Sequence, residues 1–200
     1  MNNPAYQSTA LISIIILFFS CNSKNPEDFM SNLNLIPMPT SINHLPGKFD
    51  IQSLSSIVLI NNLEGEKSCA KLFQEYLEPI KYLNLSSIKA LEESQLYIEL
   101  DTTYEINPEG YSLLIGKDNG IHLKAPTTSG LFYGFQTFKQ LCDPSLEKKE
   151  SNVNTKISNC EINDAPKFPY RGMHLDVSRH FFDITFIKTY IDMIAFHKMN

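Results

Sequence analysis

The residues with the clearest chemical potential in this chain of 200 residues are Asp176, Ser178, Arg179 and His180. Asp176 lies near the end of Phe168–Val177, a short apolar run that is typical of a buried strand, and the other three form a polar break directly after it. A guanidinium group presents several donors in a fixed plane, so Arg179 could bridge two adjacent hydroxyl groups of a ligand. This loop is therefore the candidate binding site of the chain.

The element after the loop has the spacing of an amphipathic helix. Ile187, Tyr190, Ile191 and Ile194 fall at i, i+3, i+4 and i+7 and predict one apolar helical face. Asp183 stands where a helix N-cap is expected, and Lys198 is expected in the last turn. The segment thus predicts strand, loop and helix, the opening unit of an α/β fold. Such a unit cannot bury its own apolar faces, so we expect the fold to continue beyond it.

The same stretch, FPYRGMHLDVSRHFF with the helix ending HKMN, resembles the first β/α unit of the catalytic barrel of family 20 glycoside hydrolases, the β-N-acetylhexosaminidases. Three upstream segments are also similar to that family: IPMP, EGYSLLI and SGLFYGFQTFKQL. The resemblance covers most of residues 33–200. It implies an α+β non-catalytic domain followed by the first β/α unit of a truncated TIM (β/α)8 barrel.

In a β/α barrel, chemistry lies at the carboxyl ends of the strands, where Asp176, Arg179 and His180 are expected. The resemblance implies that Arg179 binds hydroxyls of the terminal, non-reducing sugar; the alternative is a salt bridge that holds the loop. Asp176 and His180 are candidates to support the sugar site, although a buried structural carboxylate and a packed imidazole are the preferred interpretations. Three further residues are interpreted as structural: Arg171, His174 and His197.

The catalytic carboxylates of the family are not found in this sequence. The resemblance implies substrate-assisted retaining catalysis, in which an Asp orients the 2-acetamido group and an adjacent Glu acts as acid and base. It places this pair on a later barrel strand, beyond Asn200. The only neighbouring pair here is Glu27-Asp28, in a polar tether. We therefore expect these 200 residues alone to be inactive, and the family implies no cofactor.

Residues 33–142 predict the α+β domain. Expected strands are Gly47–Ile51, Ser56–Ile60, Leu96–Leu100, Glu109–Ile115 and Ile121–Ala125, with the last two forming a hairpin; expected helices are Glu66–Leu77 and Leu131–Leu141. Phe132, Phe135, Phe138 and Leu141 predict the face that packs on the sheet; the alternative for this aromatic stripe is a ligand groove. Residues 143–166 are polar and predict a linker, with Lys156–Ile162 as a candidate short strand. The barrel is expected to start at residues 167–200.

The first 21 residues have the pattern of a signal peptide. Ala10–Phe19 is too short to span a bilayer and has the length of a signal h-region. Ser20-Cys21 after it resembles a lipoprotein processing site, so Cys21 is the candidate lipidated residue and residues 22–32 a tether. The alternative is an uncleaved apolar segment or a buried strand. We expect an exported protein that touches the membrane only through a lipid anchor.

Composition and charge narrow the possible partners. The net charge is −5 and no basic block occurs, which argues against nucleic acid. The cysteines beyond Cys21 are Cys69, Cys142 and Cys160, whose spacing predicts buried apolar residues rather than a metal site. The leading hypothesis is the N-terminal part of an enzyme that acts on glycans ending in N-acetylglucosamine or N-acetylgalactosamine. The alternative is a lipid-anchored α+β binding module without catalysis. Oligomeric state is left open by the sequence.

Overall fold

The computed structural model describes residues 33–87, 94–116, 120–148, 150 and 153–200. The expected signal peptide of residues 1–21, lipidation at Cys21 and the tether of residues 22–32 lie outside the described residues. Below, residues 33–165 are called the sheet domain and residues 168–200 the C-terminal segment.

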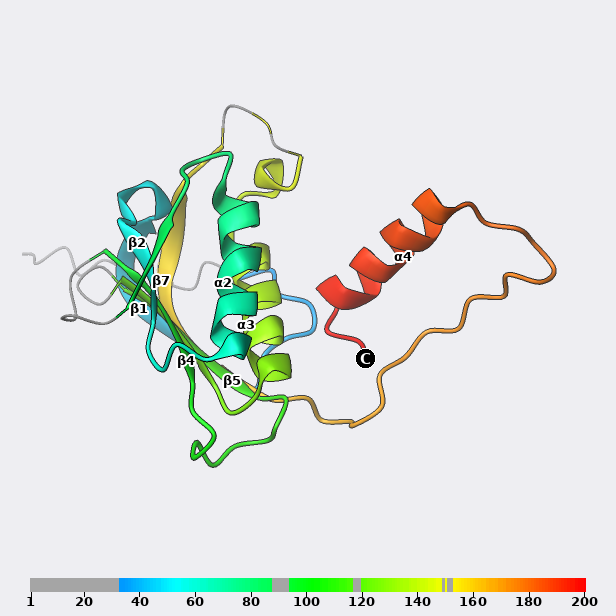
Figure 1. The fold of residues 1–200 in the computed structure, drawn as a ribbon, viewed down its shortest axis with the longest axis horizontal. Coiled ribbons are helices and arrows are strands. Elements are labelled where there is room, and N and C mark those ends of the chain that lie inside the picture. Colours follow the sequence, from blue (N-terminus) through cyan, green and yellow to red (C-terminus); the bar gives the residue numbers. More distant parts are fainter. Residues whose placement is uncertain (1–32, 88–93, 117–119, 149, 151–152) are drawn as a thin grey trace, which may run out of the picture. The chain divides into compact units, whose positions relative to one another are not determined.

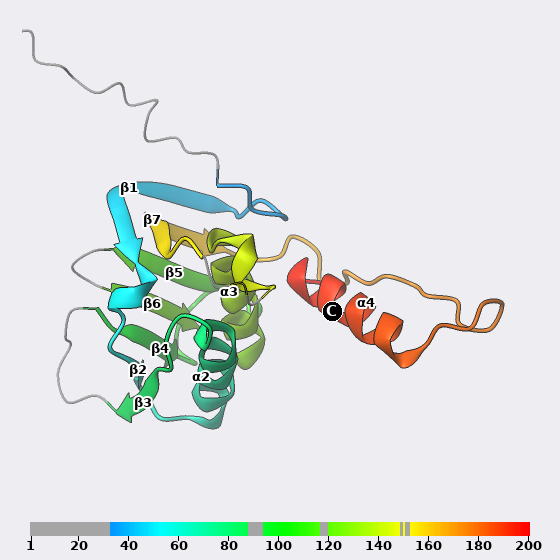
Figure 2. The same cartoon turned by 90° about the horizontal axis from the view of Figure 1, so that it is seen from above.

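One mixed sheet of seven strands organises the sheet domain, in the order β1-β7-β5-β6-β4-β2-β3 (Figure 2). The strands are β1 Ser41–Asp50, β2 Ser56–Leu59, β3 Asn84–Ser87, β4 Leu96–Leu100, β5 Tyr111–Gly116, β6 Gly120–Ala125 and β7 Lys156–Asp164. The pairs β3–β2, β2–β4 and β4–β6 are parallel, whereas β6–β5, β5–β7 and β7–β1 are antiparallel. The sheet thus joins residues that are far apart in the sequence.

Two helices, α2 Glu64–Leu77 and α3 Thr128–Leu141, cover the same face of the sheet (Figure 1). The ring of Phe73 in α2 packs against two rings of α3. Its centroid lies 4.9 Å from that of Phe135 and 5.0 Å from that of Phe138. Alternate residues of the central strands, such as Leu113 and Leu123, complete this core and are fully buried. The core therefore lies between the helices and one sheet face.

The predicted strands over 56–60, 96–100, 109–115 and 121–125 and both predicted helices are present, with small shifts at their ends. The predicted face of α3 needs a correction, because Phe132 and Leu141 are only half-buried while Tyr133 and Gly134 between them are buried. The helix is enclosed on more than one side, by the sheet and by α2. Strand β3 was not predicted, since NLSS is largely polar.

The expected linker over residues 143–166 differs from the structure. Its second half, Lys156–Asp164, is strand β7, which pairs with β1 on one side and β5 on the other. The candidate strand Lys156–Ile162 is thus a full member of the sheet. Ile157, Cys160 and Ile162 are buried in the core, although the pairing of β7 with β1 shifts register between Ser158 and Cys160.

The C-terminal segment begins without regular structure, as Figure 1 shows between β7 and α4 Ile184–Phe196. The expected strand Phe168–Val177 does not form, and in the described residues no strand lies beside it to complete a hydrogen-bond ladder. The predicted N-cap is confirmed, since the Asp183 side chain accepts a hydrogen bond from the Phe186 amide at 2.7 Å. Lys198, expected in the last turn, instead lies beyond the helix end.

Among the described residues, none of the helices has both the length and the apolar character needed to cross a bilayer.

Candidate functional site

The predicted site loop is held by one carboxylate. Asp176 accepts hydrogen bonds from the amides of Ser178 at 2.9 Å and Arg179 at 3.1 Å, and from the Arg179 Nε atom. These backbone and side-chain hydrogen bonds lower the pKa of the Asp176 carboxyl. The expectation of a buried carboxylate needs a correction, because 31% of its side-chain surface is exposed. Asp176 therefore shapes the loop while staying ionised in solvent.

The guanidinium of Arg179 lies at the surface, with 86% of the side chain exposed. Among the described residues its partner is Asp176, which engages Nε and leaves the two terminal nitrogens without a partner. The salt bridge considered as an alternative role is thus present, but it occupies only part of the donor set. His180 is exposed as well, so the expected packing around its ring is absent in this structure. The loop brings Arg179 and Asp176 together and leaves His180 apart.

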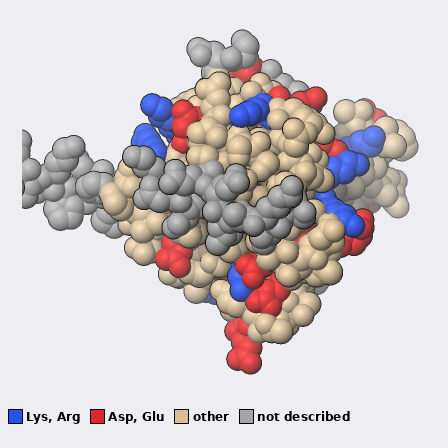
Figure 3. Space-filling view, turned by 60° about the vertical axis from the view of Figure 1, so that its left-hand side comes forward, with Lys and Arg blue, Asp and Glu red and all other residues tan. Residues whose placement is uncertain are grey.

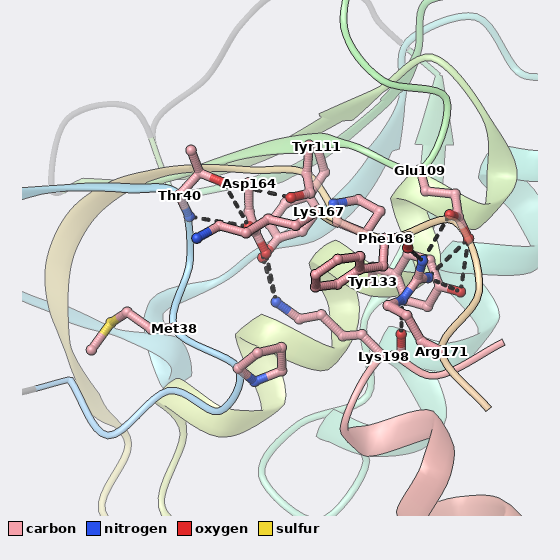
Figure 4. A pocket seen from close by; sticks show the side chains of 13 residues that line it. Met38, Thr40, Glu109, Tyr111, Tyr133, Asp164, Lys167, Phe168, Arg171 and Lys198 are labelled. Atoms are coloured by element: carbon pink, nitrogen blue, oxygen red, sulfur yellow. Dashed lines mark hydrogen bonds and ion pairs between the residues drawn. The ribbon is translucent and has the colours of Figure 1, made fainter. Parts of the chain in front are cut away.

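A second cluster of charged residues lies where the C-terminal segment meets the sheet domain (Figure 4). Both terminal nitrogens of Arg171 contact the Glu109 carboxylate at 3.0 Å. The same guanidinium donates to the Tyr133 hydroxyl at 3.1 Å and to the Phe168 and Lys198 carbonyls. The hydrogen bond from Arg171 lowers the pKa of Glu109, so this pair is charged at neutral pH. The expected structural role of Arg171 agrees with these contacts.

Lys198 forms the other half of this cluster. Its ammonium lies 2.9 Å from Asp164 Oδ2 and 2.8 Å from the Tyr111 hydroxyl, with only 8% of the side chain exposed. Burial alone would raise the pKa of Asp164, but the Lys198 charge and hydrogen bonds from Lys198, Thr40 and Tyr111 outweigh it and lower that pKa. Neither ion pair was predicted from the sequence, because Arg171 and Glu109 are 62 residues apart and Lys198 and Asp164 are 34 residues apart.

A pocket of about 280 Å³ lies over this cluster, lined by both ion pairs together with Met38, Lys167 and Phe168. Figure 4 shows the charged side chains directed toward one another. Each charged group of the two pairs already has a protein partner. The pocket is therefore a junction between the two parts of the chain, and nothing in it singles out a ligand.

The described residues contain no cluster of three or more His, Cys, Asp or Glu side chains that could hold a metal ion. Cys69, Cys142 and Cys160 are free thiols, and their burial confirms the sequence prediction. Burial raises the pKa of all three thiols, that of Cys160 to about 11, so they are protonated at neutral pH. They are packing residues rather than nucleophiles or metal ligands.

Two family models match the chain, and the boundary between them falls between the sheet domain and the C-terminal segment. Residues 32–165 match the family model for glycosyl hydrolase family 20, domain 2, and residues 168–200 match the model for the catalytic domain of that family. This confirms the expected α+β domain followed by the start of a glycoside hydrolase catalytic domain. The chain belongs to glycosyl hydrolase family 20.

Individual relatives agree with this assignment. A beta-hexosaminidase of Porphyromonas gingivalis is 31% identical over 199 residues, covering 96% of this chain and 25% of the relative. Beta-hexosaminidase 3 of Arabidopsis thaliana is 36% identical and is matched over 40% of its length. The solved structure of Streptomyces plicatus N-acetyl-beta-hexosaminidase in complex with Thio-NAglucal is similar with a TM-score of 0.74 and 27% identity, over 85% of this chain and 34% of that one. The chain spans about a quarter to two fifths of these relatives.

Proposed function

We propose that these residues are the N-terminal part of a β-N-acetylhexosaminidase that removes terminal N-acetylglucosamine or N-acetylgalactosamine from glycans. The observation that carries the proposal is the match of residues 168–200 to the catalytic domain, with Arg179 exposed in that match. The catalytic Asp-Glu pair is proposed to lie beyond Asn200, so the 200 residues alone are inactive.

Within this proposal, Arg179 binds hydroxyls of the terminal sugar. Its two terminal nitrogens are unoccupied by described residues, and Asp176 fixes the plane of the guanidinium from the Nε side. A planar, doubly donating group suits two adjacent hydroxyls on a pyranose ring. Asp176 supports the site by orienting Arg179 rather than by contacting sugar. His180 remains a candidate for a supporting contact.

The first test is the intact mass of the native product isolated from its source, followed by hydrolysis of an aryl N-acetylglucosaminide. A product several hundred residues longer than this chain, with activity, supports the proposal. A product of about 180 residues carrying lipid, without activity, would instead favour a lipid-anchored binding module.

The role of Arg179 is tested in the longer product. Loss of hydrogen bonds from a charged donor costs about 1.5–3 kcal/mol, so Arg179→Ala should lower kcat/KM by roughly tenfold to a hundredfold. Lys188→Ala, at an exposed cation of α4, is the matched control and should leave kcat/KM unchanged. Equal effects of the two substitutions would remove Arg179 from the substrate site.

We also propose that the product is exported and lipidated at Cys21. The support is the apolar run Ala10–Phe19 followed by Ser20-Cys21. Metabolic labelling with a fatty acid analogue should mark the wild type and not the Cys21→Ser variant. Labelling of both forms would contradict the anchor at this cysteine.

A further inference from the structure

The two ends of the C-terminal segment are joined to each other. The Asn200 amide donates to the Arg171 carbonyl at 3.0 Å, and the Asn200 side chain accepts from the Arg171 amide at 3.0 Å and donates to the Pro169 carbonyl at 2.8 Å. Arg171 Nε also donates to the Lys198 carbonyl at 2.8 Å. The segment is therefore a closed loop, with Asp176–His180 and α4 between its joined ends.

Each end of this closed loop carries one cation that contacts an acidic side chain of the sheet domain. Arg171 contacts Glu109, in the turn just before β5, and Lys198 contacts Asp164, at the end of β7 (Figure 4). The four side chains are 8 to 23% exposed, in contrast to the surface pair Lys71–Glu75, at 75 and 64%. Such shielded pairs are screened less by salt than surface pairs.

Apolar packing contributes little to this attachment. No residue of α4 is buried, and large side chains such as Ile184 and Ile191 are 70 and 52% exposed. Apart from the two ion pairs, the described contacts of the helix end with the sheet domain include one hydrogen bond, from Gln140 to the Phe196 carbonyl at 3.0 Å. Lys198 also has a φ of +57°, a conformation that is unfavourable for lysine and that turns the chain back toward Arg171.

We propose that Glu109 and Asp164 of the sheet domain anchor both ends of the C-terminal segment and thereby position the loop that carries Arg179. The anchoring stands on these contacts alone; its relevance to substrate rests on the proposed function. The non-catalytic domain then acts as the template on which the catalytic domain begins. Glu109 and Asp164 are positioning residues, since neither touches the loop.

Hydrogen exchange of the 200-residue chain, followed by mass spectrometry, tests the anchoring without any sugar. Glu109→Gln and Asp164→Asn should each speed exchange of the α4 amides about tenfold or more, because each removes a charge-assisted contact. Amides of β5, β6 and α3 should keep their rates. Glu75→Gln, which removes the carboxylate of an exposed pair, is the matched control and should change neither region. Unchanged α4 rates, or an equal rise throughout the sheet domain, would overturn the proposal.

A distance measurement tests the positioning. Nitroxide labels on Ser178→Cys and Glu78→Cys, in a Cys21→Ser background, report how the loop lies relative to α2; the three buried thiols stay unlabelled. We expect a narrow distance distribution that broadens in Glu109→Gln and in Asp164→Asn but not in Glu75→Gln. An equally narrow distribution in all variants would show that the loop is placed by something else. Neither readout depends on hydrolysis, so a failure of the proposed enzymatic function would leave both interpretable.

Discussion

Glu66 is a fully buried carboxylate whose partners come from three places in the sheet domain. It accepts hydrogen bonds from the amides of Asn61, Leu63 and Leu100, the last at 2.8 Å. One side chain thereby satisfies donors just after β2, at the N-cap of α2 and in β4. The sequence predicts that the helix begins at Glu66. The contact with Leu100 joins residues 34 positions apart and could not be predicted.

Removing this carboxylate should be costly, because each buried donor left unpaired costs about 1–3 kcal/mol. We expect Glu66→Ala to lower the free energy of unfolding by about 3 kcal/mol or more in urea denaturation. Glu64→Ala, in the same helical turn but 85% exposed, should change it by less than about 0.5 kcal/mol. Similar losses in the two variants would contradict the assigned role.

Contacts between residues that are close in the sequence can be predicted from the sequence alone. Asp176 and Arg179 are three positions apart, and Asp183 caps the helix that follows it, so their contacts can be inferred from spacing. Arg171 and Lys198 find partners only once β5 and β7 are in the sheet. No local pattern marks Glu109 or Asp164 as those partners, which is why the junction was missed.

At two glycines, helix α3 lies so close to its neighbours that a β-carbon would not fit. A methyl group on Gly130 would collide with the Gly110 carbonyl oxygen, whereas one on Gly134 would meet the flexible end of Leu123 and the ring of Tyr111. The backbone cannot move aside as a side chain can. The helix therefore depends on both glycines, and more strictly on Gly130.

Alanine at these positions should reveal the difference. Overpacking typically costs about 1–3 kcal/mol, so Gly134→Ala should fall in that range and Gly130→Ala should exceed it in thermal or urea unfolding. Gly116→Ala is the control, since a β-carbon there meets nothing within 4 Å. A smaller loss for Gly130→Ala than for Gly134→Ala would mean that the helix shifts as a unit.

Elements with strong periodicity were predictable, and the others failed for identifiable reasons. Leu96–Leu100 and Ile121–Ala125 alternate and became β4 and β6. Asn84–Ser87 has a single apolar residue, the exposed Leu85, and forms a strand only because β2 offers it an edge. The sequence of Phe168–Val177 favours a strand, but none forms there, because the described residues offer no partner strand to pair with it.

The attachment of the C-terminal segment should weaken in acid. Contacts with Arg171 lower the pKa of Glu109 below its ordinary value of 4.5, and those with Lys198, against the effect of burial, lower that of Asp164 below 3.8. Carboxylates with lowered pKa values stabilise the folded form above their ordinary pKa, and this contribution is lost as pH falls through the lowered value. Tyr133 and Asn200 also face Glu109, and Tyr111 and Thr40 face Asp164, but none of these gains charge in acid.

We therefore expect limited proteolysis within residues 168–200 to accelerate as pH falls below about 4, before the sheet domain unfolds. An acid-active protease and a parallel circular dichroism titration distinguish the two events. Cleavage in this segment that tracks global unfolding at every pH would contradict a separate attachment. On the face shown in Figure 3, acidic and basic side chains are interspersed, so acid leaves the basic side chains there without neutralising neighbours. The circular dichroism titration separates this general effect from the loss of the two ion pairs.

The reactivity of the three buried thiols can report the order in which parts of the sheet domain open. Cys69 lies in α2, Cys142 directly follows α3 and Cys160 lies in β7, so each belongs to a different element. Because the thiols are shielded and protonated, an alkylating reagent can reach one only when its element opens. Pulsed alkylation followed by peptide mapping would thus show whether the two helices and the sheet separate together or in sequence, without any engineered probe.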